Sequence, residues 1–239
     1  MYVGYSRPGS HEMVTEMLSK IKSEGYHGIQ LKGDQYASYL GNSDGFKTKF
    51  DTPKIMGIIV YGSDEQNLQR SIDFCKNLSI QEVTWVPSWK KGQIDHASAA
   101  EILNKFGKYA NDKGTRLSLH NHAGQLFENQ DDLREFCKLV NPEYSGLTFD
   151  TAHLALGGVK DIPAVIRECK DHVYLFHIKD VKDRKFCPLG LGELVFDGIF
   201  QAIRDIGFNE WLVVDDESDQ MTLEEALPYA AEFMGRYVK

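Results

Sequence analysis

The chain has 239 residues, of which 42% are hydrophobic and 26% charged, an ordinary globular composition that suits one large domain or two small ones. Its net charge of −8 argues against nonspecific binding to nucleic acid or to an anionic membrane, and it contains no run of about 18 apolar residues that would predict a membrane span. The first residues lack a signal-peptide core and the cysteines show no close pairing, so we expect reduced thiols and a cytoplasmic location.

Short apolar runs alternate with segments of helical periodicity along the whole chain. Strands are expected at residues 3–5, 28–31, 54–61, 82–87, 117–120, 147–150, 173–177 and 211–215. Helices are expected around residues 13–21, 68–75, 97–111, 132–140, 161–170, 196–206 and 223–237, with a short helix at most in the polar region 36–52.

This alternation predicts parallel strands joined by crossover helices. About eight such units, spaced by roughly thirty residues, predict closure into an α/β fold, a single (β/α)8 TIM barrel. The sequence shows no composition break or linker, so residues 1–239 are expected to form one domain. In such barrels the active site lies at the carboxyl ends of the strands.

Four of the expected strands end in histidine or in a carboxylate. These strand-end groups are His120 with His122, Asp150 with His153, His177, and Asp215 with Glu217. Parallel neighbouring strands bring such ends to one point, where a divalent metal is the natural occupant. We expect His120, Asp150, His177 and Asp215 as metal ligands, with Mn²⁺, Mg²⁺, Co²⁺ and Zn²⁺ all compatible with a mixed nitrogen and oxygen set.

Each of these positions also has a structural interpretation. Asp150 suits a helix N-cap, and a lone histidine such as His177 in an apolar strand is usually a core group. Alternation along a strand places Asp215 and Glu217 on one side and Asp216 on the other. By the same rule His120 and His122 share a face.

The order of these groups resembles the xylose isomerase-like barrel superfamily, which includes sugar isomerases and epimerases, inosose dehydratases and the endonuclease IV branch. The resemblance rests on Asp150-x-x-His153, then His177-Ile-Lys-Asp180, then Pro188-Leu-Gly190-Leu-Gly192-Glu193. It implies metal ligation by Asp150 and His177 and a substrate contact for His153. His120 and Asp215 depart from the pattern, because glutamates are expected at both places.

The departures bear on the proton transfer that the resemblance implies, at a carbon next to a metal-bound carbonyl. A histidine in place of one glutamate removes the usual carboxylate pair. We therefore expect the acid–base groups to come from His120, His122 and Glu217, with His122, Glu217 and His153 as the catalytic set.

Two further features indicate substrate contacts. Lys179 and Arg184 belong to a basic cluster after the seventh strand, which is either a solvated loop or a site for an anionic sugar derivative. Trp89 follows the fourth strand and is expected to stack on a sugar ring as a lid. The glycines of Gly190-x-Gly192 lack the spacing of a dinucleotide fingerprint, so no nucleotide cofactor is expected.

The function expected from these features is a metal-dependent isomerase or epimerase of a small sugar or sugar derivative. A polyol or inosose dehydratase-type lyase is the nearest alternative, followed by a barrel that binds sugar or metal without turnover. A DNA repair nuclease of the endonuclease IV type ranks last, because the third and fourth strand exits, residues 60–62 and 86–88, carry no histidine. The resemblance also implies a homo-oligomer, a dimer or a tetramer.

Overall fold

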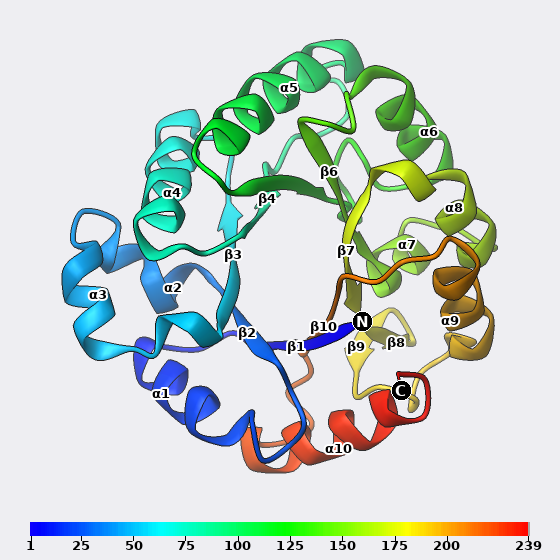
Figure 1. The fold of residues 1–239 in the computed structure, drawn as a ribbon. Helices are drawn as coiled ribbons and strands as arrows, with labels where there is room; N and C mark the ends of the chain where they lie inside the picture. The colour runs from blue at the N-terminus through cyan, green and yellow to red at the C-terminus, as the bar shows by residue number, and fades with distance from the viewer. Residues whose placement is uncertain (239) are drawn as a thin grey trace.

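The computed structural model describes residues 1–238 and shows eight parallel strands in a closed barrel, in the order β1-β10-β7-β6-β5-β4-β3-β2. Helices form a ring outside the strands (Figure 1). The predicted (β/α)8 TIM barrel is therefore confirmed. The barrel strands are β1 (Tyr2–Ser6), β2 (Gly28–Leu31), β3 (Ile55–Tyr61), β4 (Glu82–Val86), β5 (Arg116–His120), β6 (Ser145–Asp150), β7 (Val173–Ile178) and β10 (Trp211–Asp215).

Most crossover segments are helical and begin at side chains that accept a hydrogen bond from the first turn. Asp64, Asp95 and Asn129 cap three of these helices in this way. The α-helices are α1 (His11–Lys20), α2 (Gly33–Tyr36), α3 (Ser43–Lys49), α4 (Glu65–Leu78), α5 (His96–Asp112), α6 (Gln130–Leu139), α7 (Thr151–Leu156), α8 (Ile162–Glu168), α9 (Phe196–Asp205) and α10 (Leu223–Gly235). Within residues 1–238 none of them is both long and apolar enough to cross a membrane.

The structure differs from the sequence prediction in three short segments. The region after β2 is more helical than expected, because α2 is followed by a 3₁₀ turn at Ala37–Tyr39 and α3 by another at Thr52–Lys54. A short helix, α7, follows β6 directly. An antiparallel hairpin, β8 (Asp180–Lys182) with β9 (Lys185–Cys187), follows β7. The helices span only one or two turns and the hairpin only three residue pairs. Segments this short show no clear periodic pattern in the sequence.

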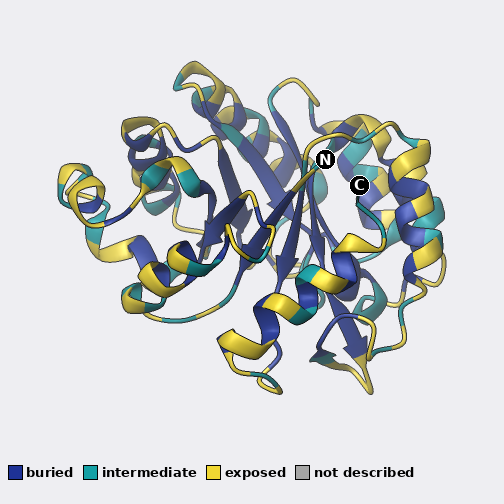
Figure 2. Cartoon of the chain, turned by 60° about the horizontal axis from the view of Figure 1, so that its bottom comes forward, coloured by how far each residue is buried: buried dark blue, intermediate teal, exposed yellow. Residues whose placement is uncertain are grey.

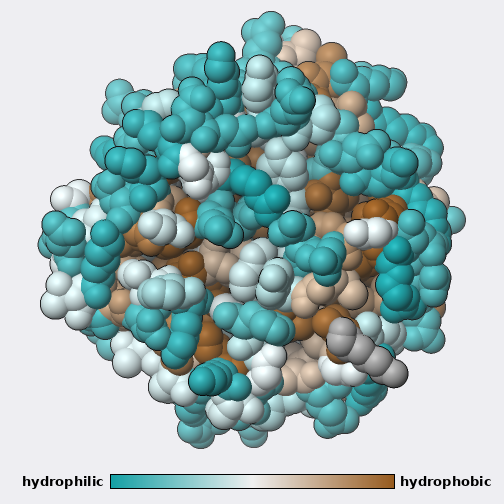
Figure 3. All heavy atoms as spheres, viewed as in Figure 1, coloured by the Kyte–Doolittle hydropathy of each residue, from teal (hydrophilic) through white to brown (hydrophobic). Residues whose placement is uncertain are grey.

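The strands are buried on both faces, whereas the helices expose their outer sides (Figure 2). Both faces of the barrel wall are covered, which explains the continuous apolar run of β3. Hydrophilic residues dominate the outline of the molecule, with hydrophobic residues in smaller patches between them (Figure 3). Inside the barrel a polar layer of Gln30, Thr84, Ser118 and Thr148 is joined by hydrogen bonds and lies beneath the strand ends.

Helix α5 packs tightly on β6 at Gly107. A Cβ atom there would lie 2.3 Å from Ser145 Oγ and from the Tyr144 carbonyl oxygen. We expect Gly107→Ala to lower the free energy of unfolding by about 1–3 kcal/mol, because the backbone cannot move away without opening the layer. Chemical denaturation measures the change. Gly235→Ala is the matched control, since a Cβ at Gly235 meets nothing within 4 Å, and equal stabilities of the two variants would contradict the packing argument.

Candidate active site at the carboxyl ends of the barrel strands

His120, Asp150, His177 and Asp215 come together at the carboxyl ends of four neighbouring strands. They lie at the ends of β5, β6, β7 and β10, which are adjacent in the barrel. One nitrogen or oxygen atom from each residue lies within 4.8 Å of the others. All four residues are at most 4% exposed. Closure of the barrel thus collects two imidazoles and two carboxylates from a span of 96 residues, numbers 120–215, into one buried cluster.

Asp150 has a different task for each carboxylate oxygen. Oδ1 accepts a hydrogen bond of 2.8 Å from the backbone N–H of His153 and so caps helix α7. Oδ2 faces the cluster, 3.4 Å from His120 Nε2 and 3.8 Å from His177 Nδ1. Asn121 fixes the backbone here, because its amide accepts from Asp150 N and donates to Asp150 O. The N-cap and cluster interpretations of Asp150 are therefore compatible.

Gln30, at the centre of β2, sets the orientation of His177. The amide nitrogen of Gln30 donates to Thr84 Oγ1, which leaves Oε1 to accept from His177 Nε2 at 2.7 Å. His177 therefore carries its proton on Nε2 and turns a free lone pair on Nδ1 toward the cluster. A partner that fixes the tautomer of a histidine in this way is typical of metal ligands.

The cluster suits one divalent cation. Asp150 Oδ2 and His177 Nδ1 are buried and have no hydrogen-bond partner within residues 1–238. Buried polar atoms rarely stay unpaired, so these two acceptor atoms are suited to bind a cation. Two imidazole nitrogens and two carboxylate oxygens, separated by 3.4–3.8 Å in the measured pairs, form a donor set that Zn²⁺ or Mn²⁺ accepts.

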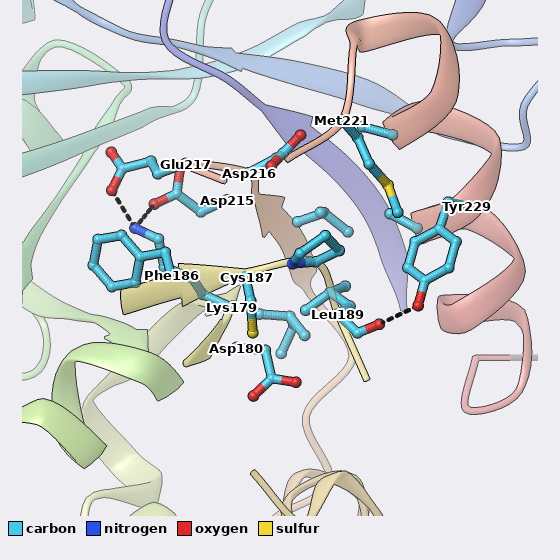
Figure 4. A pocket seen from close by; sticks show the side chains of 15 residues that line it. Lys179, Asp180, Phe186, Cys187, Leu189, Asp215, Asp216, Glu217, Met221 and Tyr229 are labelled. Atoms are coloured by element: carbon cyan, nitrogen blue, oxygen red, sulfur yellow. Dashed lines mark hydrogen bonds and ion pairs between the residues drawn. The ribbon is translucent and has the colours of Figure 1, made fainter. Parts of the chain in front are cut away.

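Two buried lysines complete the site, of which Lys179 was predicted from the sequence and Lys32 was not. Lys32 Nζ lies 2.7 Å from Asp215 Oδ1 and 2.5 Å from Glu217 Oε1. Lys179 Nζ lies 2.8 Å from Asp215 Oδ2 and 2.5 Å from Glu217 Oε2. Lys179 also faces the ring of Phe186 at 4.1 Å (Figure 4). Lys32 directly follows β2, so the strand-end rule that identified the acids would also have found it.

These ion pairs set the charge state of the carboxylates. Burial opposes ionisation of Asp150, but the Lys179 ammonium group outweighs it and holds the pKa of Asp150 well below its usual range. Burial likewise opposes ionisation of Asp215, but Lys179 and Lys32 keep its pKa low. In return, the carboxylates raise the pKa of both lysines despite burial. The site therefore contains permanent charges of both signs.

Burial keeps three histidines of the site, His122, His153 and His177, in the neutral form. Burial lowers the pKa of His177 to about 3 and that of His153 to about 2. Burial also lowers the pKa of the half-buried His122, with His120 acting in the same direction. Neutral imidazoles are able to bind a metal or accept a proton, which a protonated imidazole cannot do.

Ala123 gives His122 and His153 complementary tautomers. Its carbonyl oxygen lies 2.9 Å from His122 Nδ1, so that nitrogen carries the proton and Nε2 is free to accept one. Its N–H donates to His153 Nδ1 at 3.4 Å, so His153 carries its proton on Nε2. The two ring centroids are 3.9 Å apart. One imidazole of the pair is thus a proton acceptor and the other a hydrogen-bond donor.

Two predicted substrate contacts do not have the expected geometry. Arg184 lies at the exposed turn of the β8–β9 hairpin, while Lys179 is buried in the site, so the predicted basic cluster is split between two environments. Trp89 is only 8% exposed and packs against Trp85 with ring centroids 4.9 Å apart. The loop after β4 folds back through a hydrogen bond from Leu126 N to Trp89 O, so the predicted lid is a core side chain.

The remaining strand-end acids are structural. Asp216 accepts from Tyr5 and Arg7 on the other side of β10 from the cluster, as alternation predicted. Asp180 accepts backbone N–H groups from Gly190 and Gly192 and so closes the loop after β9. A Cβ atom at Gly192 would lie 2.2 Å from Asp180 Oδ1, which explains the glycine. The Asp180 and Gly-x-Gly part of the motif therefore shapes the rim of the site.

The chain is similar in sequence to curated proteins named inosose dehydratase. The chain is 27% identical to an inosose dehydratase of Clostridium perfringens (strain 13 / Type A) over an alignment of 159 residues that covers 59% of this chain and 52% of that protein. It is 28% identical to an inosose dehydratase of Mesomycoplasma hyopneumoniae (strain 7448) over an alignment of 140 residues that covers 50% of this chain and 46% of that protein. The chain therefore spans about half the length of the curated relatives it matches.

Solved structures share the fold over the full chain. The IolI protein with a binding zinc atom matches with a TM-score of 0.79 at 19% identity, covering 100% of this chain and 98% of that one. A D-allulose 3-epimerase from Methylomonas sp. matches with a TM-score of 0.82 at 14% identity, covering 100% and 98%. The family model described as xylose isomerase-like TIM barrel matches residues 63–237. The chain belongs to the xylose isomerase-like TIM barrel family.

Proposed function

We propose that the protein is a divalent-metal-dependent enzyme that moves a proton next to a carbonyl group of a small sugar or sugar derivative. The observation that carries this proposal is the buried cluster of His120, Asp150, His177 and Asp215. A metal held there supplies a Lewis acid for the carbonyl oxygen. The family membership and the relatives named as epimerases and dehydratases support the same class of reaction. The cytoplasmic location and the homo-oligomer stay predictions.

The chain's own acid–base groups lie at the two ends of the cluster. His122 follows β5 and offers a free Nε2, while Glu217 follows β10. Because β6 and β7 lie between those strands, the two groups face a bound substrate from different sides. His122 is placed to accept a proton from one side and Glu217 to exchange one on the other. His153, with its proton on Nε2, donates a hydrogen bond to a substrate oxygen.

Two outcomes are chemically open to such a site. Return of the proton to the same or a neighbouring carbon gives an epimerase or isomerase, which is our first proposal. Loss of a neighbouring hydroxyl group as water gives a dehydratase. The two relatives at 27% and 28% identity, both named inosose dehydratases, favour this second candidate. Both reactions begin with the same proton abstraction.

Proton exchange with solvent separates these possibilities. Metal-loaded protein is incubated in deuterated water with ketoses, aldoses, their phosphates, sugar acids and inososes, and the products are followed by NMR spectroscopy. We expect deuterium to enter at one carbon next to a carbonyl. Retention of all oxygens identifies an isomerase or epimerase, and loss of water identifies a dehydratase. Absence of exchange with every compound, at full metal loading, would contradict the proposal.

The role of Gln30 is tested through metal affinity. Gln30→Leu removes the acceptor that fixes His177 Nδ1 toward the cluster, and we expect metal affinity to fall by about 10–100-fold. Competition with a chromogenic chelator measures the affinity. Gln30→Glu keeps an acceptor at the same place and is the control, with a smaller change expected. Equal affinity of Gln30→Leu and the unaltered protein would show that this hydrogen bond does not position a ligand.

A further inference from the structure

Lys32 and Lys179 hold a carboxylate that faces the opening of the site. Both ammonium groups contact Asp215, and both contact Glu217, one on each of its oxygens. The Asp215 side chain is 2% exposed, whereas that of Glu217 is 26% exposed. Glu217 also lies beyond the end of β10, in a segment without regular structure. Of the two carboxylates between the lysines, Glu217 is therefore the one that is free to leave.

The charge balance of the site favours an anionic ligand. Asp150, Asp215 and Glu217 contribute three negative charges, and Lys32 and Lys179 contribute two positive ones. A divalent cation would change the total from −1 to +1. Because an uncompensated charge in a buried site is costly, one further negative charge is needed for neutrality.

We propose that the substrate is a sugar acid, and that its carboxylate replaces Glu217 between Lys32 and Lys179. This inference rests on the proposed function and names the substrate class of the same site. The substrate carboxylate has the same chemistry as the group it displaces and receives the same charge-assisted hydrogen bonds. Glu217, released from both ammonium groups, becomes available as the second acid–base group. Substrate recognition and the release of a catalytic carboxylate are then one event.

The surroundings of Lys179 fit this exchange. Its ammonium group rests on the face of Phe186, a contact that does not involve Glu217. Asp215 continues to contact both lysines, so their positions do not depend on Glu217. Lys179, Phe186, Asp215 and Glu217 line one pocket between the β8–β9 hairpin and helix α10 (Figure 4).

Matched pairs of acid and neutral ligands test the substrate class without turnover. Isothermal titration calorimetry compares D-gluconate with D-glucitol and D-glucuronate with D-glucose on metal-loaded protein. Within at least one pair we expect the acid to bind ~10-fold more tightly or better, because two ammonium groups bind its carboxylate. Elemental analysis accompanies each titration, so that removal of the metal by the acid is detected.

Three variants distinguish binding of the carboxylate between Lys32 and Lys179 from nonspecific electrostatic attraction of the acid to the protein. Lys32→Met is expected to reduce the preference for the acid by about 10-fold or more at unchanged metal content. Glu217→Gln removes the competing carboxylate, so the acid is expected to bind this variant more tightly than it binds the unaltered protein. Lys182→Met, in the exposed part of the hairpin, is the control and leaves the preference unchanged.

The inference is overturned if neither acid binds more tightly than its neutral partner to the unaltered protein and to Glu217→Gln. It is also overturned if Glu217→Gln binds the acid more weakly, since Glu217 would then assist binding instead of competing. Deuterium exchange with neutral sugars in the absence of any acid preference would refute the substrate class and leave the proposed function intact. An acid preference that depends on Lys32, without exchange on any compound, would refute the proposed function alone.

Discussion

The site depends on ion pairs that compensate the negative charge of its buried aspartates. Closing eight parallel strands into a barrel forces the ends of β5, β6, β7 and β10 together, and two of those ends carry aspartates that are at most 3% exposed. Such carboxylates are stable only when cations or hydrogen bonds surround them. Lys32 and Lys179 supply the cations, and the first turn of α7 donates a backbone hydrogen bond to the Asp150 carboxylate. The buried carboxylates of the cluster are therefore compensated by ion pairs and hydrogen bonds within the barrel.

Most of the fold could be predicted from the sequence because its elements are long and regular. Strands buried on both faces read as continuous apolar runs, as at residues 54–61, and their spacing gave the barrel. Helix α7 and the β8–β9 hairpin were missed because each is set by local hydrogen bonds instead of periodicity. The helix starts at Asp150, whose side chain serves both the helix and the cluster.

The site could be predicted where chemistry coincides with a strand end. His120, Asp150, His177 and Asp215 were all identified in this way, and the structure brings them within 4.8 Å. Side chains that act through tertiary contacts were harder to find. Gln30 lies inside an apolar strand and bonds His177, while Lys32 lies just after that strand and pairs with Asp215. No sequence pattern indicates either partner. The burial of Trp89 depends on a loop path that no local pattern specifies.

The central claim is that these four side chains bind one metal ion beside the buried ammonium groups of Lys32 and Lys179. Anomalous diffraction from crystals grown with Zn²⁺ or Mn²⁺ tests it most directly. We expect a single peak at about 2.0–2.2 Å from donor atoms of His120, Asp150, His177 and Asp215. No peak at this position, with Lys179 still paired to Asp215 at full metal concentration, would contradict the account.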